Sequence, residues 1–530
     1  MNLTSLHSVL LSLFVFPFLA IAQNITASLD YGTFQGAYSS TYNITYYQKI
    51  PFAAPPTGNN RFRGPQPPLP ITNGTYNSIQ TFPACPQKGN VGSEDCLYLS
   101  LYSRPWTSNQ PLRPVMVVFF GGGFIQGGGS LAVPPSAYPI LNVSAQNDIL
   151  FVYPNYRVNT FGFLPGKEIA EDESSDLNPG LLDQRAVLEW VNKYIDQFGG
   201  DKDNVGIWGK VQEREVCAQV LATSGETTPP FFNRALASSP FWPKTYTYDA
   251  PQAQSIYDTM TDLTNCTGAI NGTLQCLKSL EWEVLAEAAL VVAASHTWNT
   301  SSYTWAPVID GTFLKKTLSE ATVNAKGGEN FVPSGLQNAT DTGTPPFNST
   351  IASFNVWLAG YLPSFSHSQL DAVRALYPLS GPAETFPAYN TTYERAGLIY
   401  RDSVLACPAL WTSKAASGSG WMGEYTISPA RHGSDTIYHP NKWNQVNAVQ
   451  KSQPLIYQGY AGAFASFMAT GNPNQHKLTN ASEPGVPEVS TGMEYVIASD
   501  GFENVEIDGG RYSLEARCKF WASVARSVPI

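Results

Sequence analysis

Pro114-Val115-Met116-Val117-Val118-Phe119-Phe120-Gly121-Gly122-Gly123-Phe124 joins an apolar run to three consecutive glycines. The apolar run predicts a strand that ends at the first glycine. Glycines directly after a strand can present backbone N–H groups to an oxyanion, which is the electrostatic part of acyl transfer. An isolated glycine triplet would favour a flexible turn instead, so the surrounding motifs have to decide between the two interpretations.

Further motifs lie before and after this run in a fixed order. They are Ile50-Pro51-Phe52-Ala53, Arg61-Phe62, Glu94-Asp95-Cys96-Leu97-Tyr98-Leu99, Asn155-Tyr156-Arg157, Phe161-Gly162-Phe163-Leu164, Gly180-Leu181-Leu182-Asp183-Gln184 and Phe198-Gly199-Gly200-Asp201. The ordered set resembles the type-B carboxylesterase family, which includes cholinesterases and some fungal lipases. The resemblance runs from about Gly32 to Trp521. It implies an α/β-hydrolase fold, in which helices flank a large, mostly parallel central sheet.

Composition agrees with one large domain. No linker, internal repeat or low-complexity tract divides the 530 residues, and the resemblance implies a single domain over residues 23–530. Hydrophobic residues make up 43% of the chain, which suits a large buried core. A net charge of −10 without a basic cluster argues against nucleic-acid binding. Neither a cofactor nor a metal site is expected, and nothing in the sequence indicates an oligomeric state.

The N-terminus and the glycosylation motifs predict a secreted glycoprotein. Residues 1–22 contain an apolar core and end in Ala20-Ile21-Ala22, which indicates a signal peptide although no Lys or Arg precedes the core. No later apolar run is long enough to span a membrane. N-glycosylation motifs beyond the signal begin at Asn24, Asn43, Asn73, Asn142, Asn265, Asn271, Asn299, Asn338, Asn348, Asn390 and Asn480.

Seven cysteines in an oxidising compartment suggest three disulfides and one remaining thiol. Spacing alone does not determine the connectivity. The family resemblance implies the pairs Cys85–Cys96, Cys266–Cys276 and Cys407–Cys518. Cys217 is then left as a packed helix residue, because a nucleophile would need an exposed turn.

Serine acyl transfer needs a nucleophile, a histidine base, an acid and oxyanion donors. The resemblance assigns the base to His432, in Arg431-His432-Gly433-Ser434-Asp435, and the oxyanion donors to Gly122 and Gly123. Phe120 stands where many relatives have histidine, which leaves the backbone donors unchanged.

The nucleophile is missing. Asn204-Val205-Gly206-Ile207-Trp208-Gly209 predicts a strand that should open into the turn G-x-S-x-G. Lys210-Val211-Gln212-Glu213-Arg214-Glu215-Val216 follows instead, and the nearest serine downstream is Ser224. Burying these charges without partners is expensive, so we expect a displaced or frayed helix start over residues 210–216.

The acid is also missing from its expected place. Val308-Ile309-Asp310-Gly311-Thr312-Phe313-Leu314 matches the segment that precedes the acid strand in relatives. About ten residues of the family pattern are absent near residue 327, and we expect no strand after Asn324. Glu329 is the nearest carboxylate and a weak candidate for the acid; Glu320 and Asp341 have weaker claims.

A change of reading frame accounts for the altered turn. The family sequence Glu-Ser-Ala-Gly-Ala-Gly-Ser-Val can be encoded by GAA AGT GCA GGA GCG GGA AGT GTG. Without the first G, these bases read AAA GTG CAG GAG CGG GAA GTG and encode Lys210 to Val216. The loss of two more bases restores the frame at Cys217. Our hypothesis is that two compensating changes hide a serine turn, whose serine codon straddles Lys210 and Val211. The changes would be sequence errors, a faulty gene model or real mutations.

Two functions therefore compete at this level. The first is a secreted carboxylic-ester hydrolase, inactive or impaired as written because of the altered turn at residues 209–216 and the lost acid strand. Its substrate would be a small-molecule or lipid ester. The second is a non-catalytic binding or adhesion protein on the same scaffold.

Overall fold

The computed structural model describes most of the chain from Ile25 onwards. The described residues are 25–87, 91–143, 146, 148–210, 231–238, 244–300, 304–315, 332–343, 346–379, 381–383, 386–415, 419–427, 451–478, 483–507, 514–525 and 527. All structural statements below concern these residues.

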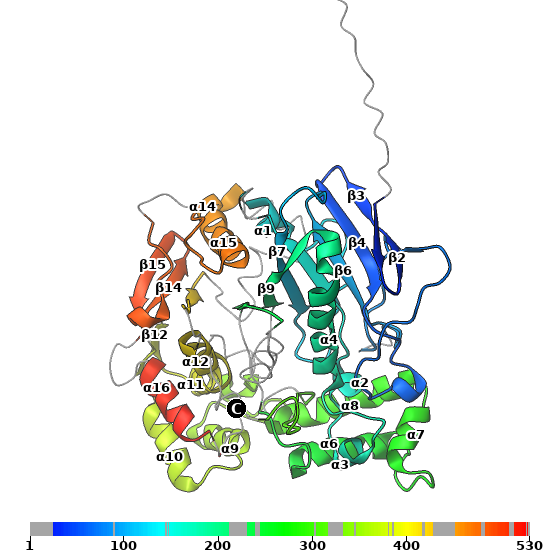
Figure 1. The fold of residues 1–530 in the computed structure, drawn as a ribbon. Coiled ribbons are helices and arrows are strands. Elements are labelled where there is room, and N and C mark those ends of the chain that lie inside the picture. The colour runs from blue at the N-terminus through cyan, green and yellow to red at the C-terminus, as the bar shows by residue number, and fades with distance from the viewer. Residues whose placement is uncertain are drawn as a thin grey trace, which may run out of the picture.

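A seven-stranded mixed sheet forms the centre of the molecule (Figure 1). Its parallel part contains β10, β9, β7 and β8, and the antiparallel pairs β8–β6, β6–β4 and β4–β3 extend it. In spatial order the strands are β10 (Arg234–Ser238), β9 (Gly200–Lys210), β7 (Arg113–Phe120), β8 (Leu150–Pro154), β6 (Tyr98–Ser103), β4 (Ile44–Pro51) and β3 (Ala37–Ser39).

Three small sheets lie outside the central one. They are β1 (Thr26–Leu29), β2 (Gly32–Gln35) and β5 (Thr75–Asn77); β11 (Gly381–Ala383) and β12 (Phe386–Tyr389); and β13 (Gly423–Tyr425), β14 (Met493–Ala498) and β15 (Gly501–Glu506). The helices are α1 (Tyr138–Val143), α2 (Asn159–Phe163), α3 (Lys167–Glu171), α4 (Pro179–Tyr194), α6 (Pro251–Leu263), α7 (Thr273–Ser279), α8 (Trp282–Thr300), α9 (Ile351–Tyr361), α10 (His367–Leu376), α11 (Thr392–Arg401), α12 (Cys407–Ala415), α14 (Pro454–Ile456), α15 (Gly462–Thr470) and α16 (Leu514–Ser523).

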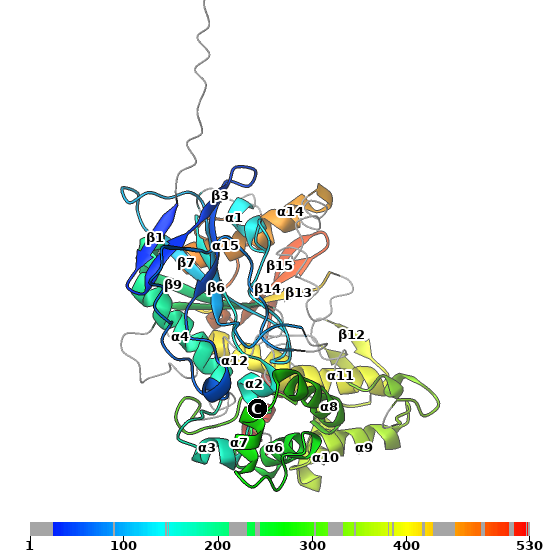
Figure 2. The same ribbon diagram turned by 90° about the vertical axis from the view of Figure 1, so that its right-hand side faces the viewer.

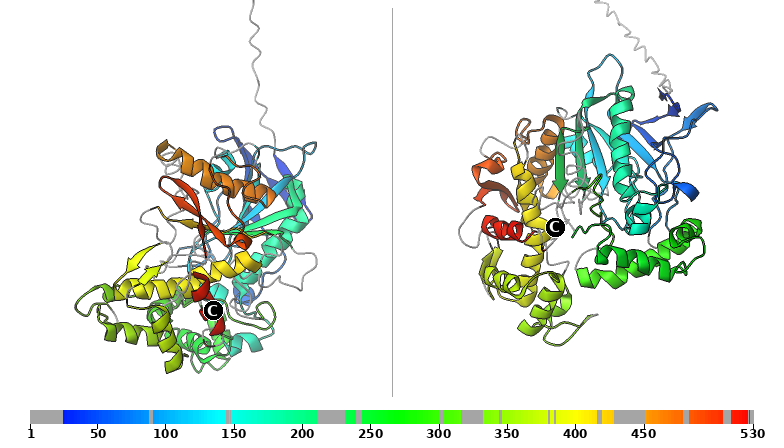
Figure 3. Two further views of the ribbon diagram at one scale, coloured as in Figure 1. Left: turned by 90° about the vertical axis from the view of Figure 1, so that its left-hand side faces the viewer. Right: turned by 60° about the horizontal axis from the view of Figure 1, so that its bottom comes forward.

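Both faces of β7 are buried, which explains its continuous apolar sequence. Successive side chains of a strand point to opposite faces. Val115, Val117 and Phe119 share one core cluster with α4 residues such as Leu188, whereas Met116 and Val118 share another with residues of α1 and α15. Helix α4 therefore covers one face of the sheet, and α1 and α15 cover the other (Figure 3). This layering is that of an α/β protein.

A layer of helices lies beyond one end of the sheet. It contains α6 to α10 and is seen at the bottom of Figure 1 and Figure 2. Helix α2, which follows the carboxyl end of β8, contacts α8 in this layer. The layer thus faces the end of the sheet from which the glycine run departs. None of the helices in the described ranges is long and apolar enough to cross a membrane.

A buried ion pair fastens α4 to the segment after β8. The Arg157 guanidinium lies 2.7 Å from the Asp183 carboxylate, and both side chains are almost fully shielded from water. The backbone N–H of Arg157 also donates to Asp183 over 3.0 Å. Two glycines allow this approach, because a Cβ atom at Gly162 or Gly180 would lie within 2.5 Å of the Arg157 carbonyl oxygen. The motifs that contain Arg157 and Asp183 are therefore partners in space.

Substituting Asp183→Ala should lower the free energy of unfolding by about 3–5 kcal/mol, because it leaves the Arg157 charge buried without a partner. Urea unfolding monitored by circular dichroism measures the change. Asp30→Ala, which removes a partner from the exposed Lys193–Asp30 pair, serves as the control and should have little effect. Equal losses in the two variants would contradict the role assigned to burial.

Lys244, which the sequence pattern did not single out, is buried without a carboxylate partner among the described residues. Its ammonium group donates to the Tyr361 carbonyl oxygen and lies 4.5 Å from the centroid of the Tyr361 ring. Burial lowers the pKa of Lys244 to about 7. Between that pH and the ordinary lysine pKa, the unfolded chain binds a proton that the folded protein has lost, so stability rises with pH.

The substitution Lys244→Met should therefore raise the melting temperature most below pH 7, where the native protein buries a charged lysine. The gain should shrink as the pH rises from about 7 towards about 10. Scanning calorimetry at pH 6, 8 and 9 measures it, with the exposed Lys167→Met as the control. A gain that does not depend on pH would show that the lysine charge is not the cause.

Candidate functional site

The carboxyl ends of β7 and β9 lie side by side where the glycine run begins. Phe119 pairs with Gly209, and Phe120 pairs with Lys210, in parallel register. Because neighbouring strands are only about 4.8 Å apart, the chain leaves β9 next to Gly121–Gly123. This edge of a parallel sheet is where ligands bind in α/β proteins. The missing serine turn thus belongs beside the predicted oxyanion donors.

The glycine run forms a tight loop that only glycine can make. Gly122 has a φ angle of 144° and Gly123 one of 66°, both in the region that disfavours side chains. A Cβ atom at Gly122 would lie 1.9 Å from the carbonyl oxygen of Gln126, so the two ends of the loop are in direct contact. The glycine run therefore folds as a closed turn after β7.

Hydrogen bonds hold several carbonyl groups of this loop, whereas the N–H groups of the two predicted oxyanion donors are open. Within the described residues, the backbone N–H groups of Gly122 and Gly123 donate to no acceptor. Two adjacent N–H groups held by a fixed loop can stabilise a developing oxyanion. The carbonyl groups that accept hydrogen bonds belong to Phe120, Gly122, Phe124, Ile125 and Gly127.

Phe120 and Tyr156 hold the start of the loop. Their rings stack with centroids 4.0 Å apart and an interplanar angle of 8°. The Tyr156 hydroxyl donates to the Phe120 carbonyl oxygen. Tyr156 belongs to a recognised sequence motif, but its contact with the loop was not predicted, because it joins segments of the chain that are 36 residues apart.

Of the other predicted site residues, the structure places Asp341, which is exposed and accepts a hydrogen bond from Asn348 Nδ2 over 2.7 Å. The base His432, the weak candidate acid Glu329 and Cys217 lie outside the described residues, as do residues 211–230 and 316–331. The predicted helix start after Lys210 and the predicted loss of a strand after Asn324 belong to the same undescribed segments.

The segment that precedes the predicted acid is anchored to α4. Asp310 accepts hydrogen bonds from the backbone N–H groups of Thr312, Phe313 and Leu314 and thereby closes a turn. Asn178, just before α4, donates to the Asp310 carboxylate over 2.6 Å and pairs with the backbone of Val308. The family-like segment is thus held in place up to the point at which the acid strand should begin.

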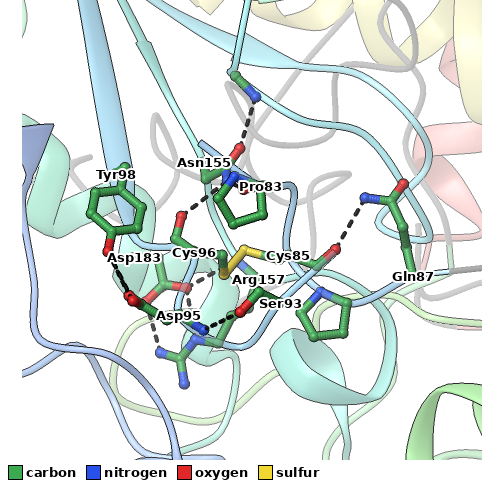
Figure 4. Close-up of a disulfide and its surroundings, with 12 residues drawn as sticks. Pro83, Cys85, Gln87, Ser93, Asp95, Cys96, Tyr98, Asn155, Arg157 and Asp183 are labelled. Carbon is green, nitrogen blue, oxygen red and sulfur yellow. Dashed lines mark hydrogen bonds and ion pairs between the residues drawn. A yellow bond between two sulfur atoms is a disulfide. The ribbon is translucent and has the colours of Figure 1, made fainter. Parts of the chain in front are cut away.

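The three disulfides join Cys85 to Cys96, Cys266 to Cys276 and Cys407 to Cys518. These are the pairs that the family resemblance implies. The first, shown in Figure 4, closes a short loop. Gln87 of this loop is hydrogen-bonded to Gly127, which follows the glycine run. Among the described residues, no cluster of His, Cys, Asp and Glu side chains could hold a metal ion.

Comparison with known proteins identifies the family. The chain is 33% identical to the secreted triacylglycerol lipase LIP1 of Gibberella zeae, over 61% of this chain and 58% of that lipase. It is 26% identical to the carboxylesterase patB of Aspergillus clavatus, over 92% of this chain and 94% of the relative. Its fold is similar to the crystal structure of Aspergillus niger EstA, with a TM-score of 0.79 and 22% identity over 95% of this chain and 99% of that chain. Residues 23–497 match the model of the carboxylesterase family. This match confirms the resemblance inferred from the ordered motifs, and the chain belongs to the carboxylesterase family.

Proposed function

We propose that this scaffold is that of a carboxylic-ester hydrolase that works by serine acyl transfer. The observation that carries the proposal is the pair of open N–H groups at Gly122 and Gly123, beside the end of β9. A serine at that turn would attack the ester carbonyl, and the two N–H groups would stabilise the resulting oxyanion. His432 would take the serine proton and return it to the leaving alcohol.

The chain as written has the oxyanion donors but no nucleophile. Lys210 and Val211 replace the serine, and neither offers a hydroxyl group beside Gly122. Without an acyl-enzyme step, hydrolysis depends on direct attack by water, which the remaining groups assist weakly. Glu329 is a weak candidate for the acid that would orient His432. In its present form the chain is therefore inactive or impaired, and the alternative is a non-catalytic binding protein.

The proposed compartment is extracellular. LIP1 of Gibberella zeae is named a secreted lipase, and the three disulfides of this chain suit an oxidising environment. Residues 1–22 act as the signal peptide in this proposal. Several predicted glycosylation sites, such as Asn73, Asn265 and Asn271, are exposed to solvent and leave room for N-glycans.

The proposed substrates are soluble esters. LIP1 carries a name that specifies triacylglycerol, whereas the loop closed by Cys85 and Cys96 is short here and is held by hydrogen bonds from Gln87. A short, fixed loop offers little apolar surface for movement at a lipid interface. This feature favours small carboxylic esters over emulsified lipids.

Replacing Lys210–Val216 with Glu-Ser-Ala-Gly-Ala-Gly-Ser-Val should restore hydrolysis of p-nitrophenyl butyrate. The expected gain in kcat over the unmodified chain is about 10⁴-fold or more, because the acyl-enzyme route becomes available. The same replacement with alanine in place of the new turn serine is the control and should remain inactive.

Full activity of the unmodified chain would refute this account of the site. Activity that requires repair of both the turn and the acid segment near residue 327 would support damage to a former enzyme. Inactivity of every repaired form would favour the binding protein. Resequencing genomic DNA and transcript tests the reading-frame hypothesis separately, since clean reads that encode Lys210–Val216 would exclude a sequence error.

The repaired enzyme should hydrolyse tributyrin below its solubility limit without a jump in rate when an emulsion forms. The physical reason is the short Cys85–Cys96 loop, whose Gln87 side chain is hydrogen-bonded to Gly127. A pH-stat titration across the solubility limit measures the rate. A sharp rise on emulsification would contradict the proposed preference for soluble esters.

A further inference from the structure

The loop closed by Cys85 and Cys96 is joined to the glycine loop by the side chain of Gln87. The Gln87 Nε2 group donates to the Gly127 carbonyl oxygen over 2.9 Å, and the Gly127 N–H donates back to Oε1 over 2.9 Å. Nε2 also donates to the Cys85 carbonyl oxygen over 3.1 Å. One carboxamide therefore uses its acceptor and both of its N–H groups to connect the disulfide to the end of the glycine loop.

A second carboxamide joins the same two loops. Asn159 donates from Nδ2 to the carbonyl oxygens of Pro86 and Ile125, over 2.8 and 3.4 Å. Its backbone N–H donates to the Phe124 carbonyl oxygen. Asn159 is buried and adopts a positive φ angle of 47°, a conformation that asparagine tolerates better than most residues.

A third carboxamide completes the connection (Figure 4). The fully buried Asn155 accepts from the backbone N–H of Gly129 over 2.8 Å. It donates to the carbonyl oxygens of Pro83 and Cys96, over 2.8 and 2.9 Å. Three amide side chains thus connect the disulfide loop and its neighbour Pro83 to residues 125–129, and all of these contacts are with backbone groups.

The Gln87 contact reaches the oxyanion donors through a short, closely packed path. The Gly122 carbonyl group accepts from the N–H groups of Ile125 and Gln126, so residues 122–126 form a closed turn. A Cβ atom at Gly127 would lie 2.2 Å from the Phe120 ring, and one at Gly122 would meet the Gln126 carbonyl oxygen. A shift of Gly127 must therefore move the turn that carries the Gly122 and Gly123 N–H groups.

We propose that the Cys85–Cys96 loop acts as a splint: it holds the glycine loop, with its Gly122 and Gly123 N–H groups, in a fixed position. Gln87 is the positioning residue that joins the two loops. Gln87 does not touch the reacting atoms; it fixes the peptide groups that do. This inference rests on the proposed ester-hydrolase function for its catalytic meaning, but the mechanical connection exists in the chain as written.

Hydrogen exchange in the full-length, unmodified chain tests the mechanical part. Gln87→Met removes all three hydrogen bonds and should speed amide exchange in residues 121–129 by about tenfold. Gln87→Glu keeps an acceptor for the Gly127 N–H and should give a smaller increase. Gln80→Met is the matched control, because the exposed Gln80 contacts only the Asn77 carbonyl group among the described residues.

Amide exchange in two disulfide variants tests the connection between the Cys85–Cys96 loop and the glycine loop a second time. Replacing both Cys85 and Cys96 with serine should speed exchange in residues 121–129. Replacing both Cys266 and Cys276, which close a loop of similar size, should leave that segment unchanged. Equal exchange in all variants and the parent would overturn the splint.

Kinetics in the turn-repaired chain test the catalytic part. Gln87→Met should lower kcat about tenfold and change KM little, because the oxyanion forms in the transition state and not in the bound ester. Gln87→Glu should recover part of kcat. If Gln87→Met exchanges faster but keeps its kcat, the Gln87 contacts only stabilise the loop, and the positioning role is refuted. Inactivity of every repaired parent, including the one repaired at both the turn and the acid segment, would instead refute the proposed function, while the exchange data still decide the splint.

Discussion

The ion pair between Arg157 and Asp183 is the contact on which the carboxyl edge of the sheet depends. Arg157 follows β8, and Asp183 lies in the first turns of α4, so the pair fixes a helix to the loop that leaves the neighbouring strand. Because both side chains are buried, water cannot replace either partner of the ion pair. The helix and loop must therefore dock in one relative placement, which is also why glycine occupies positions 162 and 180.

The residues that position the candidate site lie next to Arg157 and Asp183 in the sequence. Asn155 and Asn159 flank Arg157 along the chain, and both donate hydrogen bonds to the disulfide loop. Tyr156 between them reaches the Phe120 carbonyl group. On the other side of the pair, Asn178 precedes α4 and holds Asp310. One short segment after β8 thus positions the glycine loop, and the start of α4 positions the segment that leads to the predicted acid.

The ordered motifs of the sequence predicted the family and its fold. They did not predict which side chains from distant parts of the chain form hydrogen bonds or ion pairs with each other. Pro114–Phe124 predicted a strand followed by a glycine loop. The motifs around Arg157 and Asp183 were recognised, but their pairing was not, because a pattern of letters does not say which buried charge meets which. Gln87 gave no signal at all. Its importance comes from facing Gly127 across a gap of 40 residues, and any polar loop can contain a glutamine. The predictions for His432, Glu329 and the altered turn remain predictions, since these residues lie outside the described part of the chain.

Several carbonyl groups of the glycine loop accept hydrogen bonds from Tyr156, from Asn159 of α2 and from Gln87 of the disulfide loop. The residues that shape this loop and the residues of the altered turn, Lys210–Val216, are different parts of the sequence, so a mutation in one part need not change the other. Under the proposed function, loss of the serine would abolish acyl transfer, whereas the glycine loop would keep its shape. Under the same proposal, a reversion of the turn and of the acid segment near residue 327 would meet a glycine loop that is already in position.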